Sequence, residues 1–224
     1  MLPVKILVLL AAFGCHALVE ASNETTLCPP TTDDSRDGED SLCPSFQDLR
    51  DIIDEIALME LIQAHYQCNA KFRKALCYYN SSRFHLVAQQ LQQSEAYISM
   101  LADLRNAGVD TTDIESIVNI FACLELSLPK LKKSCDCKQL RGHTFVGDLL
   151  ASMSHQAVHD YTAVARANHT NFGLFADTIT SSAFQARMRT NMLKSDALRP
   201  LRLLRRYGWD VQEILGAAMS ILSW

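Results

Sequence analysis

The sequence predicts an all-α protein made of two tandem copies of one helical unit, each of about 100 residues. Glycine (8) and proline (6) are scarce among the 224 residues, which favours long helices over many short strands. Apolar residues recur at spacings of three and four, the pattern of one helix face, as at Leu49, Ile52, Ile53 and Ile56. The chain also matches itself when it is shifted by 100 residues.

The N-terminus is typical of a secretory signal peptide. Lys5 supplies the positive charge, residues 6–13 form the apolar run, and Val19 and Ala21 fit a small-residue cleavage site after Ala21. Cleavage after Ala17 is a weaker alternative. The apolar run is too short to span a bilayer, and no later stretch has about 18 uncharged apolar residues. We therefore expect a secreted mature chain without stable membrane insertion.

The segment that follows, residues 22–44, is predicted to be an acidic, disordered leader. It is rich in Thr, Asp, Ser and Pro, and Arg36 is its single basic residue. We favour a solvated tail over an acidic binding patch. Because the chain has a formal net charge of −4, it has no general attraction to nucleic acid, and we predict no nucleic-acid partner.

From Phe46 onward the pattern is helical. Gly108 and Gly208 fit positions just after a helix, where the left-handed conformation is cheap, and Asp110 and Asp210 fit the N-caps of the next helices. Helices this short need tertiary packing to be stable. In the first copy we expect them near 46–53, 55–67, 69–79, 82–93, 95–107 and 110–126, with the second copy at the same offset.

The match between the copies falls on apolar core positions and on helix boundaries, which are the positions that a shared fold constrains, so we infer a duplication. The predicted organisation is a signal peptide (1–21), the leader (22–44) and a helical domain (45–224), divided into repeat one (46–126), a connector (127–143) and repeat two (144–224). The identities include Asp48-Leu49 with Asp148-Leu149, Phe72 with Phe172, Ser81-Ser82-x-Phe84 with Ser181-Ser182-x-Phe184, and Leu101, Leu104, Arg105, Gly108, Asp110 and Ile114 with the residues 100 positions later.

Seven cysteines remain after the signal peptide, and in an exported chain we expect them to form disulfides. Seven is odd, so one thiol is free or pairs between chains. The expected pairs are Cys28–Cys43, Cys68–Cys77 and Cys123 with either Cys135 or Cys137. Three sequons at predicted loops or termini are candidates for N-glycosylation, at Asn23, Asn80 and Asn168.

No motif indicates catalysis or a cofactor. The chain lacks a Gly-x-Ser-x-Gly elbow, a papain-like cysteine context and a phosphate-binding glycine loop. His155 and His159 can share a helix face, but zinc needs a third protein ligand and the first copy lacks the pair. Disulfides are favoured over the zinc cluster that can be drawn from Cys123, Cys135, Cys137 and His143. We therefore predict no enzyme activity, no metal site and no cofactor.

The densest basic stretch lies in the second copy. We favour a solvated helical face for it, and the functional alternative is attraction to fatty-acid carboxylates or to anionic membrane surfaces. Arg105 and Arg205 share a repeat position, where a cation suits a helix C-terminus. The stretch comprises Arg187, Arg189, Lys194, Arg199, Arg202, Arg205 and Arg206.

These features resemble the insect allergen-related repeat family, which includes cockroach group 1 allergens, gut microvillar proteins and nitrile-specifier proteins. The resemblance covers about Phe46 to Trp224 and rests on three features. They are the opening Phe-x-Asp-Leu, the spacing of Phe72 and Phe84, and the Leu-x-x-Leu-x-x-x-Gly-x-Asp element at 101–110 and 201–210. The chain departs from the family pattern in its many cysteines, its acidic leader and its single pair of repeats.

The resemblance implies a closed shell of about twelve short helices around a large apolar cavity that holds fatty acids or related lipids. A pocket with few polar groups is the usual form of a lipid site. Without the family, the same apolar residues would be read as ordinary core. The residues predicted to line the cavity are Ile53, Ile56, Leu61, Phe72, Leu76, Phe84, Leu101, Leu104, Ile114, Ile117, Phe121, Leu149, Met153, Phe172, Phe184, Leu201, Leu204 and Ile214.

The resemblance therefore predicts a secreted, non-enzymatic carrier of fatty acids or similar apolar molecules in the insect gut lumen or lining. One alternative is a detoxification factor of the nitrile-specifier type, which would need a reactive metal or thiol site inside the cavity. Another is a structural or interaction protein of the gut lining, with the leader or the glycans as contact points. The sequence makes no prediction of oligomeric state.

Overall fold

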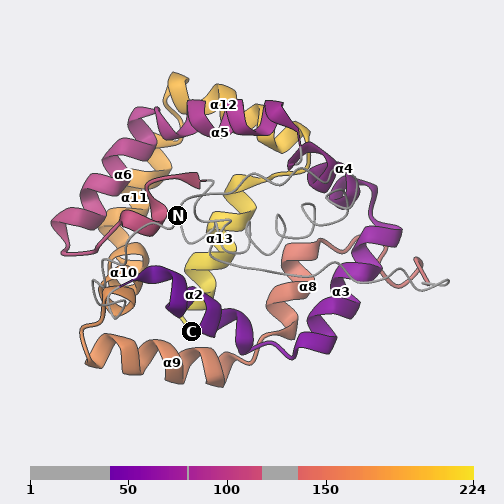
Figure 1. The fold of residues 1–224 in the computed structure, drawn as a ribbon, viewed down its shortest axis with the longest axis horizontal. Helices are drawn as coiled ribbons and strands as arrows, with labels where there is room; N and C mark the ends of the chain where they lie inside the picture. The colour runs from indigo at the N-terminus through magenta and orange to yellow at the C-terminus, as the bar shows by residue number, and fades with distance from the viewer. Residues whose placement is uncertain (1–40, 80, 118–135) are drawn as a thin grey trace, which may run out of the picture.

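The structure, a computed structural model, describes residues 41–79, 81–117 and 136–224, and every regular element in these ranges is helical (Figure 1). This confirms the predicted all-α class. The first copy contains α2 (Leu42–Asp51), α3 (Glu55–Cys68), α4 (Ala70–Tyr79), α5 (Ser82–Gln92), α6 (Glu95–Asn106) and the 3₁₀ turn η2 (Thr112–Ile114). The second copy contains α8 (Phe145–Ser152), α9 (His155–Ala167), α10 (Asn171–Thr180), α11 (Ser182–Asn191), α12 (Ser195–Arg206) and α13 (Val211–Leu222).

The helix starts follow the repeated serines. The Ser81 hydroxyl accepts a hydrogen bond from the Phe84 N–H at 3.3 Å, and Ser181 caps Phe184 in the same way at the same distance. An N-cap of this kind satisfies one of the N–H groups that a helix start leaves unpaired. Both phenylalanines are buried, at 1% and 2% exposure, so the cap and the core contact fix the start of α5 and of α11 together.

The helix ends follow the repeated glycines. Gly108 has φ 84° and Gly208 has φ 96°, so both are left-handed, as predicted. In each copy the next residue donates its N–H to the carbonyl of the leucine five positions earlier, at 3.0 Å, which closes the end of α6 and of α12. Asp210 caps α13 as predicted by accepting from the Glu213 N–H. Asp110 accepts instead from the Thr112 N–H and hydroxyl, ahead of η2.

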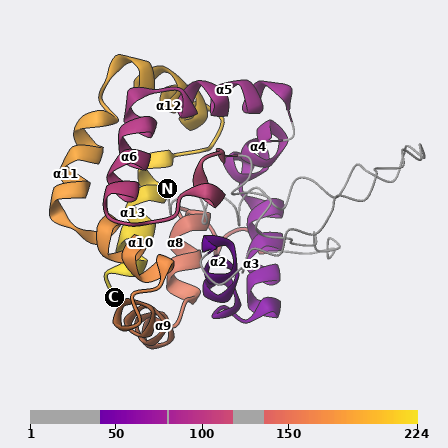
Figure 2. The ribbon, with the colours of Figure 1, turned by 60° about the vertical axis from the view of Figure 1, so that its left-hand side comes forward.

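The two copies interlock around one core. Helix α5 of the first copy packs along α12 of the second, and α6 of the first copy packs along α11 of the second (Figure 2). The contacts therefore run between the copies. In Figure 1 helix α13 lies inside a ring that runs through α3, α4, α5, α6, α10 and α9, and α13 contacts α8, α9, α10 and α12. The apolar residues of α13 that are buried there are Ile214, Leu215, Ala217, Ala218, Ile221 and Leu222.

Helix α2 begins earlier than predicted, inside the segment assigned to the disordered leader. Ser41 accepts from the Cys43 N–H, and its hydroxyl donates to Asp113 Oδ2 at 2.6 Å. Leu42 is fully buried next to Phe46, which gives the added turn an apolar face to bury. Residues 42–44, which the sequence analysis assigned to the leader, therefore belong to α2. Within the described ranges, no helix is both long and apolar enough to cross a bilayer.

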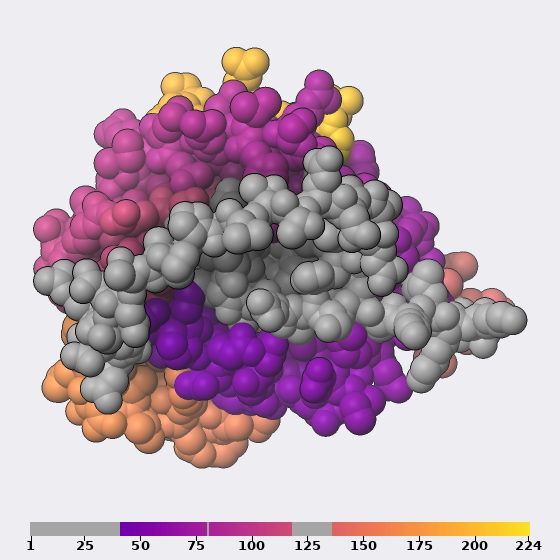
Figure 3. All heavy atoms as spheres, viewed as in Figure 1, coloured from indigo at the N-terminus to yellow at the C-terminus, as the bar shows by residue number. Residues whose placement is uncertain are grey.

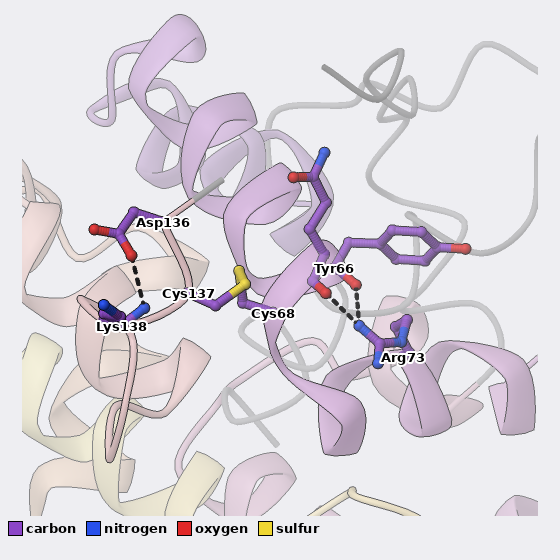
Figure 4. The surroundings of a disulfide bond; sticks show 7 residues. Tyr66, Cys68, Arg73, Asp136, Cys137 and Lys138 are labelled. Carbon is purple, nitrogen blue, oxygen red and sulfur yellow. Dashed lines mark hydrogen bonds between the residues drawn. A yellow bond between two sulfur atoms is a disulfide. The ribbon is translucent and has the colours of Figure 1, made fainter. Parts of the chain in front are cut away.

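A disulfide joins Cys68, at the end of α3, to Cys137, in the turn that precedes α8 (Figure 4). The Cα atoms are 5.1 Å apart, and the bond ties two segments that are 69 residues apart in the sequence. The predicted Cys68–Cys77 pair is therefore wrong: Cys77 is a free thiol on the exposed side of α4. Cys137 is likewise not paired with Cys123. Cys43 is disulfide-bonded, and its predicted partner Cys28, like Cys123 and Cys135, lies outside the described residues.

Candidate functional site

An apolar cavity of about 90 Å³ lies among α5, α6, α11, α12 and α13. The interlocked pairs of helices form its walls, so both copies contribute to it. The residues that line it are Phe84, Ala88, Leu91, Ala96, Tyr97, Met100, Ile117, Met188, Met192, Ala197, Leu201, Leu204, Val211 and Leu215.

Small side chains leave this space open. Ala88 on α5, Ala96 on α6 and Ala197 on α12 face the cavity from three helices. Ala88 and Ala197 are 1% and 0% exposed, so neither position opens to the surface. Three methionines complete the wall, and their flexible thioethers adapt to the shape of a neighbouring group.

The Tyr97 hydroxyl is the polar side-chain group among these lining residues, and it is already paired. It donates to the Ile114 carbonyl at 2.9 Å. Burial, and secondarily the charge of Glu115, raise the pKa of Tyr97 well above its usual range, so the phenol stays neutral. The described wall therefore provides surface for hydrocarbon, but no acid, base or nucleophile for chemistry.

The volume is small for the ligand class that the resemblance implies. An apolar cavity of about 150 Å³ engineered in another protein holds one benzene molecule. A rigid cavity of about 90 Å³ therefore holds only a few carbons of a fatty-acid chain. The wall includes Ile117, the last described residue before 118–135. The large cavity implied by the resemblance is not seen among the described residues.

The predicted lining residues divide into several groups. Four line the cavity, namely Phe84, Ile117, Leu201 and Leu204. Leu61 is half-buried against the core, and Phe121 lies outside the described residues. The others are buried in the core away from this wall, at Ile53, Phe72, Leu76, Leu101, Leu104, Ile114, Leu149, Met153, Phe172, Phe184 and Ile214.

Ile56 does not line an internal cavity, because it is 70% exposed. The buried face of α3 runs through Leu58, Ile62 and His65, at helical spacings of four and three. Ile56 lies on the opposite side of that helix, so its prediction is corrected. The sequence analysis also missed the alanines and methionines of this wall, because it selected mainly large aliphatic and aromatic residues.

The remaining candidate positions have structural contacts. His155 stacks on Trp224 with ring centres 3.7 Å apart, and His159 Nδ1 lies 3.0 Å from the Trp224 carbonyl oxygen. The two histidines therefore hold the C-terminal residue. Asn168 is exposed at the end of α9, while Asn23 and Asn80 lie outside the described residues. No group of three or more His, Cys, Asp or Glu able to hold a metal occurs in the described part of the chain.

A buried imidazole joins the copies away from the cavity. His65 of α3 has a fully buried side chain, and its Nε2 lies 2.8 Å from Asp148 Oδ2 of α8. The other carboxylate oxygen of Asp148 is 2.7 Å from His143 Nδ1. Burial lowers the pKa of His65 overall, although the hydrogen bond and the charge of Asp148 oppose this effect. The His65 ring also packs edge-on against Phe72 and Phe145.

The fold defines a class of protein: an all-α domain in which helices from both halves of the chain wall a small apolar space. The family model described as insect allergen related repeat, nitrile-specifier detoxification, matches residues 41–215. The chain belongs to the insect allergen-related repeat family, which confirms the resemblance seen in the sequence. No curated protein and no solved structure matches the chain significantly.

Proposed function

We propose that this protein is a secreted, non-enzymatic carrier of fatty acids or similar apolar molecules in the insect gut. The cavity among α5, α6, α11, α12 and α13 carries the proposal, because its described wall is apolar and its single hydroxyl is already hydrogen-bonded. An apolar ligand in such a site leaves no polar group of the described wall without a hydrogen-bond partner.

The energetics of burial favour this use of the cavity. Each methylene that leaves water contributes about 0.8 kcal/mol, so a hydrocarbon chain binds without any directed contact. Met100, Met188 and Met192 supply flexible walls that can move aside for a longer chain. We therefore propose that the cavity of about 90 Å³ enlarges around the ligand by rearrangement of these side chains.

Lipid analysis of the protein from its natural source tests the carrier function. Extraction of the folded protein with organic solvent should release lipid in stoichiometric amount, detected by mass spectrometry. A folded sample that releases none contradicts the proposal. The carrier function also predicts that filling the cavity weakens ligand binding.

The substitution Ala88→Met fills the space with the residue that the second copy has at the equivalent position, Met188. It removes room for about two methylenes, so we expect binding of a fluorescent fatty acid to weaken about tenfold. The matched control is Ala186→Met on the exposed side of α11, which should bind like the wild type. If the two variants bind the fatty acid with equal affinity, the fatty acid does not bind in this cavity.

The family description also names nitrile-specifier detoxification. That chemistry needs a reactive thiol or a metal next to the bound product. Cys77, the free thiol of the described residues, lies on the surface with Lys74 and Tyr207 and does not line the cavity. The carrier function is therefore the better supported candidate. The ratio of nitrile to isothiocyanate formed by myrosinase distinguishes the two, since a carrier leaves it unchanged.

A further inference from the structure

Helix α12 has two chemically different faces. Ala197, Leu201 and Leu204 point inward and line the cavity. Arg199, Arg202 and Arg206 are exposed on the outer side, at spacings of three and four, so they form one row along the helix. A single helix therefore separates the apolar cavity from a basic surface.

The three outer arginines have no ion pair with another described residue. The cations at the two ends of α12 are paired, Arg205 with Asp210 at 2.9 Å and Lys194 with Glu95 at 2.7 Å. The printed sequence has no Asp or Glu between Glu60 and Glu95, so α4 and α5 carry no acidic residue. Since α5 packs along α12, no carboxylate of α5 neutralises this row.

The basic surface extends beyond α12. Lys74 of α4 donates from Nζ to the Arg206 carbonyl at 3.0 Å, which places its charge at the C-terminal end of the row. Arg83, at the start of α5, lines the same surface hollow as Lys74. We call Lys74, Arg83, Arg199, Arg202 and Arg206 the basic surface. It contrasts with the formal net charge of −4 of the whole chain.

Apolar groups are interleaved with these cations. Leu198 and Leu203 are half-buried beside the arginines and line a shallow hollow with them on the outer face of α12. On the neighbouring α5, Leu86 is 59% exposed. Figure 3 shows the segment of α12 at the rim of the molecule, where it projects behind α5. Arginine with leucine at the edge of a molecule suits a membrane interface, where phosphates lie next to hydrocarbon.

We propose that the basic surface docks on membranes that contain anionic phospholipid, with the arginines on the phosphates and the leucines at the level of the first acyl carbons. This inference rests on the proposed carrier function, because it places the wall of the cavity against the bilayer from which a ligand enters or into which it leaves. Electrostatic attraction makes the contact reversible and sensitive to salt.

Co-sedimentation with vesicles tests the docking. The wild-type protein should bind vesicles of phosphatidylcholine with phosphatidylserine at low salt, and should bind neither pure phosphatidylcholine nor the mixed vesicles at high salt. The substitution Arg199→Gln with Arg202→Gln should lower the partition coefficient about 25-fold, because each basic residue at an anionic surface contributes about a fivefold factor. Both side chains are exposed, so circular dichroism should report an unchanged fold.

The matched control is Lys138→Gln with Arg141→Gln, which removes the same charge from exposed residues in the turn before α8. This pair should retain most of the binding. An equal loss in both double variants would mean that overall charge, and not the basic surface, drives binding. No binding of the wild type to anionic vesicles would also overturn the proposal, and so would binding to heparin in its place.

Fatty-acid binding separates this inference from the function on which it rests. The Arg199→Gln, Arg202→Gln variant should bind a fluorescent fatty acid like the wild type, because neither arginine lines the cavity. A variant that still binds the fatty acid but no longer binds vesicles has lost the docking and kept the carrier function. Vesicle binding by a protein that takes up no fatty acid removes the carrier function, and leaves the basic surface with another role at the membrane.

Discussion

Helices α6 and α12 occupy the same position in the two copies, yet they differ in charge on their outer sides. Their buried sides share two leucines but differ elsewhere, since α6 has Tyr97 and Met100 where α12 has Ala197 and Pro200. Each follows the preceding helix after a turn of two or three residues, and each is followed by a left-handed glycine, Gly108 or Gly208. The inward leucines are identical, Leu101 and Leu104 in α6 and Leu201 and Leu204 in α12. At the positions of the outer arginines Arg199, Arg202 and Arg206, α6 has the uncharged residues Ser99, Ala102 and Asn106. Of these, Ser99 is half-buried and accepts a hydrogen bond from Asn191 of α11.

The comparison of α6 with α12 distinguishes buried positions, which packing constrains, from exposed positions, which can change without loss of the fold. Packing holds the inner leucines, since replacing either one leaves a void in a closely packed interior. Solvent-exposed positions carry no such constraint, so the outer side of α12 can hold cations that stability does not need. The arrangement offers an internal comparison, because α6 occupies the equivalent position without the basic row.

The largest expected effect compares the inner leucines. Leu104 is fully buried away from the cavity, whereas Leu204 lines it. Replacement of a buried leucine by alanine costs about 3–5 kcal/mol, and less where neighbouring atoms are already missing. We expect Leu104→Ala to lower the free energy of unfolding by about 4 kcal/mol and Leu204→Ala by about 3 kcal/mol. Urea unfolding measures both, and a larger loss for Leu204→Ala would contradict the placement of the cavity.

A smaller effect compares the two glycines. A Cβ at Gly208 would lie 2.7 Å from the Lys71 carbonyl oxygen and 3.0 Å from the Ala75 Cβ, while at Gly108 its nearest neighbour is 3.7 Å away on Leu174. The left-handed backbone costs alanine about 1 kcal/mol at either site, and crowding adds about 2 kcal/mol at Gly208. Gly208→Ala should therefore destabilise the fold about three times as much as Gly108→Ala. Equal shifts of the unfolding midpoint would mean that the backbone at residue 208 relaxes freely.

The parts of the fold that sequence predicted are local. Left-handed glycines and helical spacing depend on a few neighbouring residues, so the sequence predicted the roles of Gly108 and Gly208. The caps at Ser81 and Ser181 are equally local, although the sequence analysis noted these serines only as a match between the copies. The extra turn of α2 escaped prediction because Ser41 is fixed by a contact with Asp113, far away in the sequence.

The cavity depends on how helices of the two copies pack against each other. Contacts between segments so far apart leave no short pattern in the sequence, so the cavity wall could not be predicted from it. Phe84 and Phe184 share a repeat position and a cap, yet Phe84 lines the cavity and Phe184 does not. The Cys68–Cys137 bond has the same origin, because it joins two segments brought together by packing. A small residue at an interface, such as Ala88, carries no distinctive pattern at all.

The smallest expected effect compares His65 with Ala165, the residues at one buried position of the two copies. Because burial lowers the pKa of His65 below its usual value near 6.5, the unfolded chain binds more protons than the folded chain between those two pKa values. The contribution of His65 to stability is therefore present above pH 6.5 and decreases as the pH falls below it. One proton limits the slope to about 1.4 kcal/mol per pH unit.

The substitution His65→Leu should remove this slope, which urea unfolding at pH 7.5 and at lower values measures. His85→Gln is the matched control, since His85 is exposed on α5. The free energy of unfolding of the wild type should then decrease more steeply on acidification than that of His65→Leu. Stability that rises on acidification in the wild type alone would instead mean that His65 is protonated in the fold and held by Asp148. The contact between α3 and α8 would then be an ion pair, with no counterpart at Ala165.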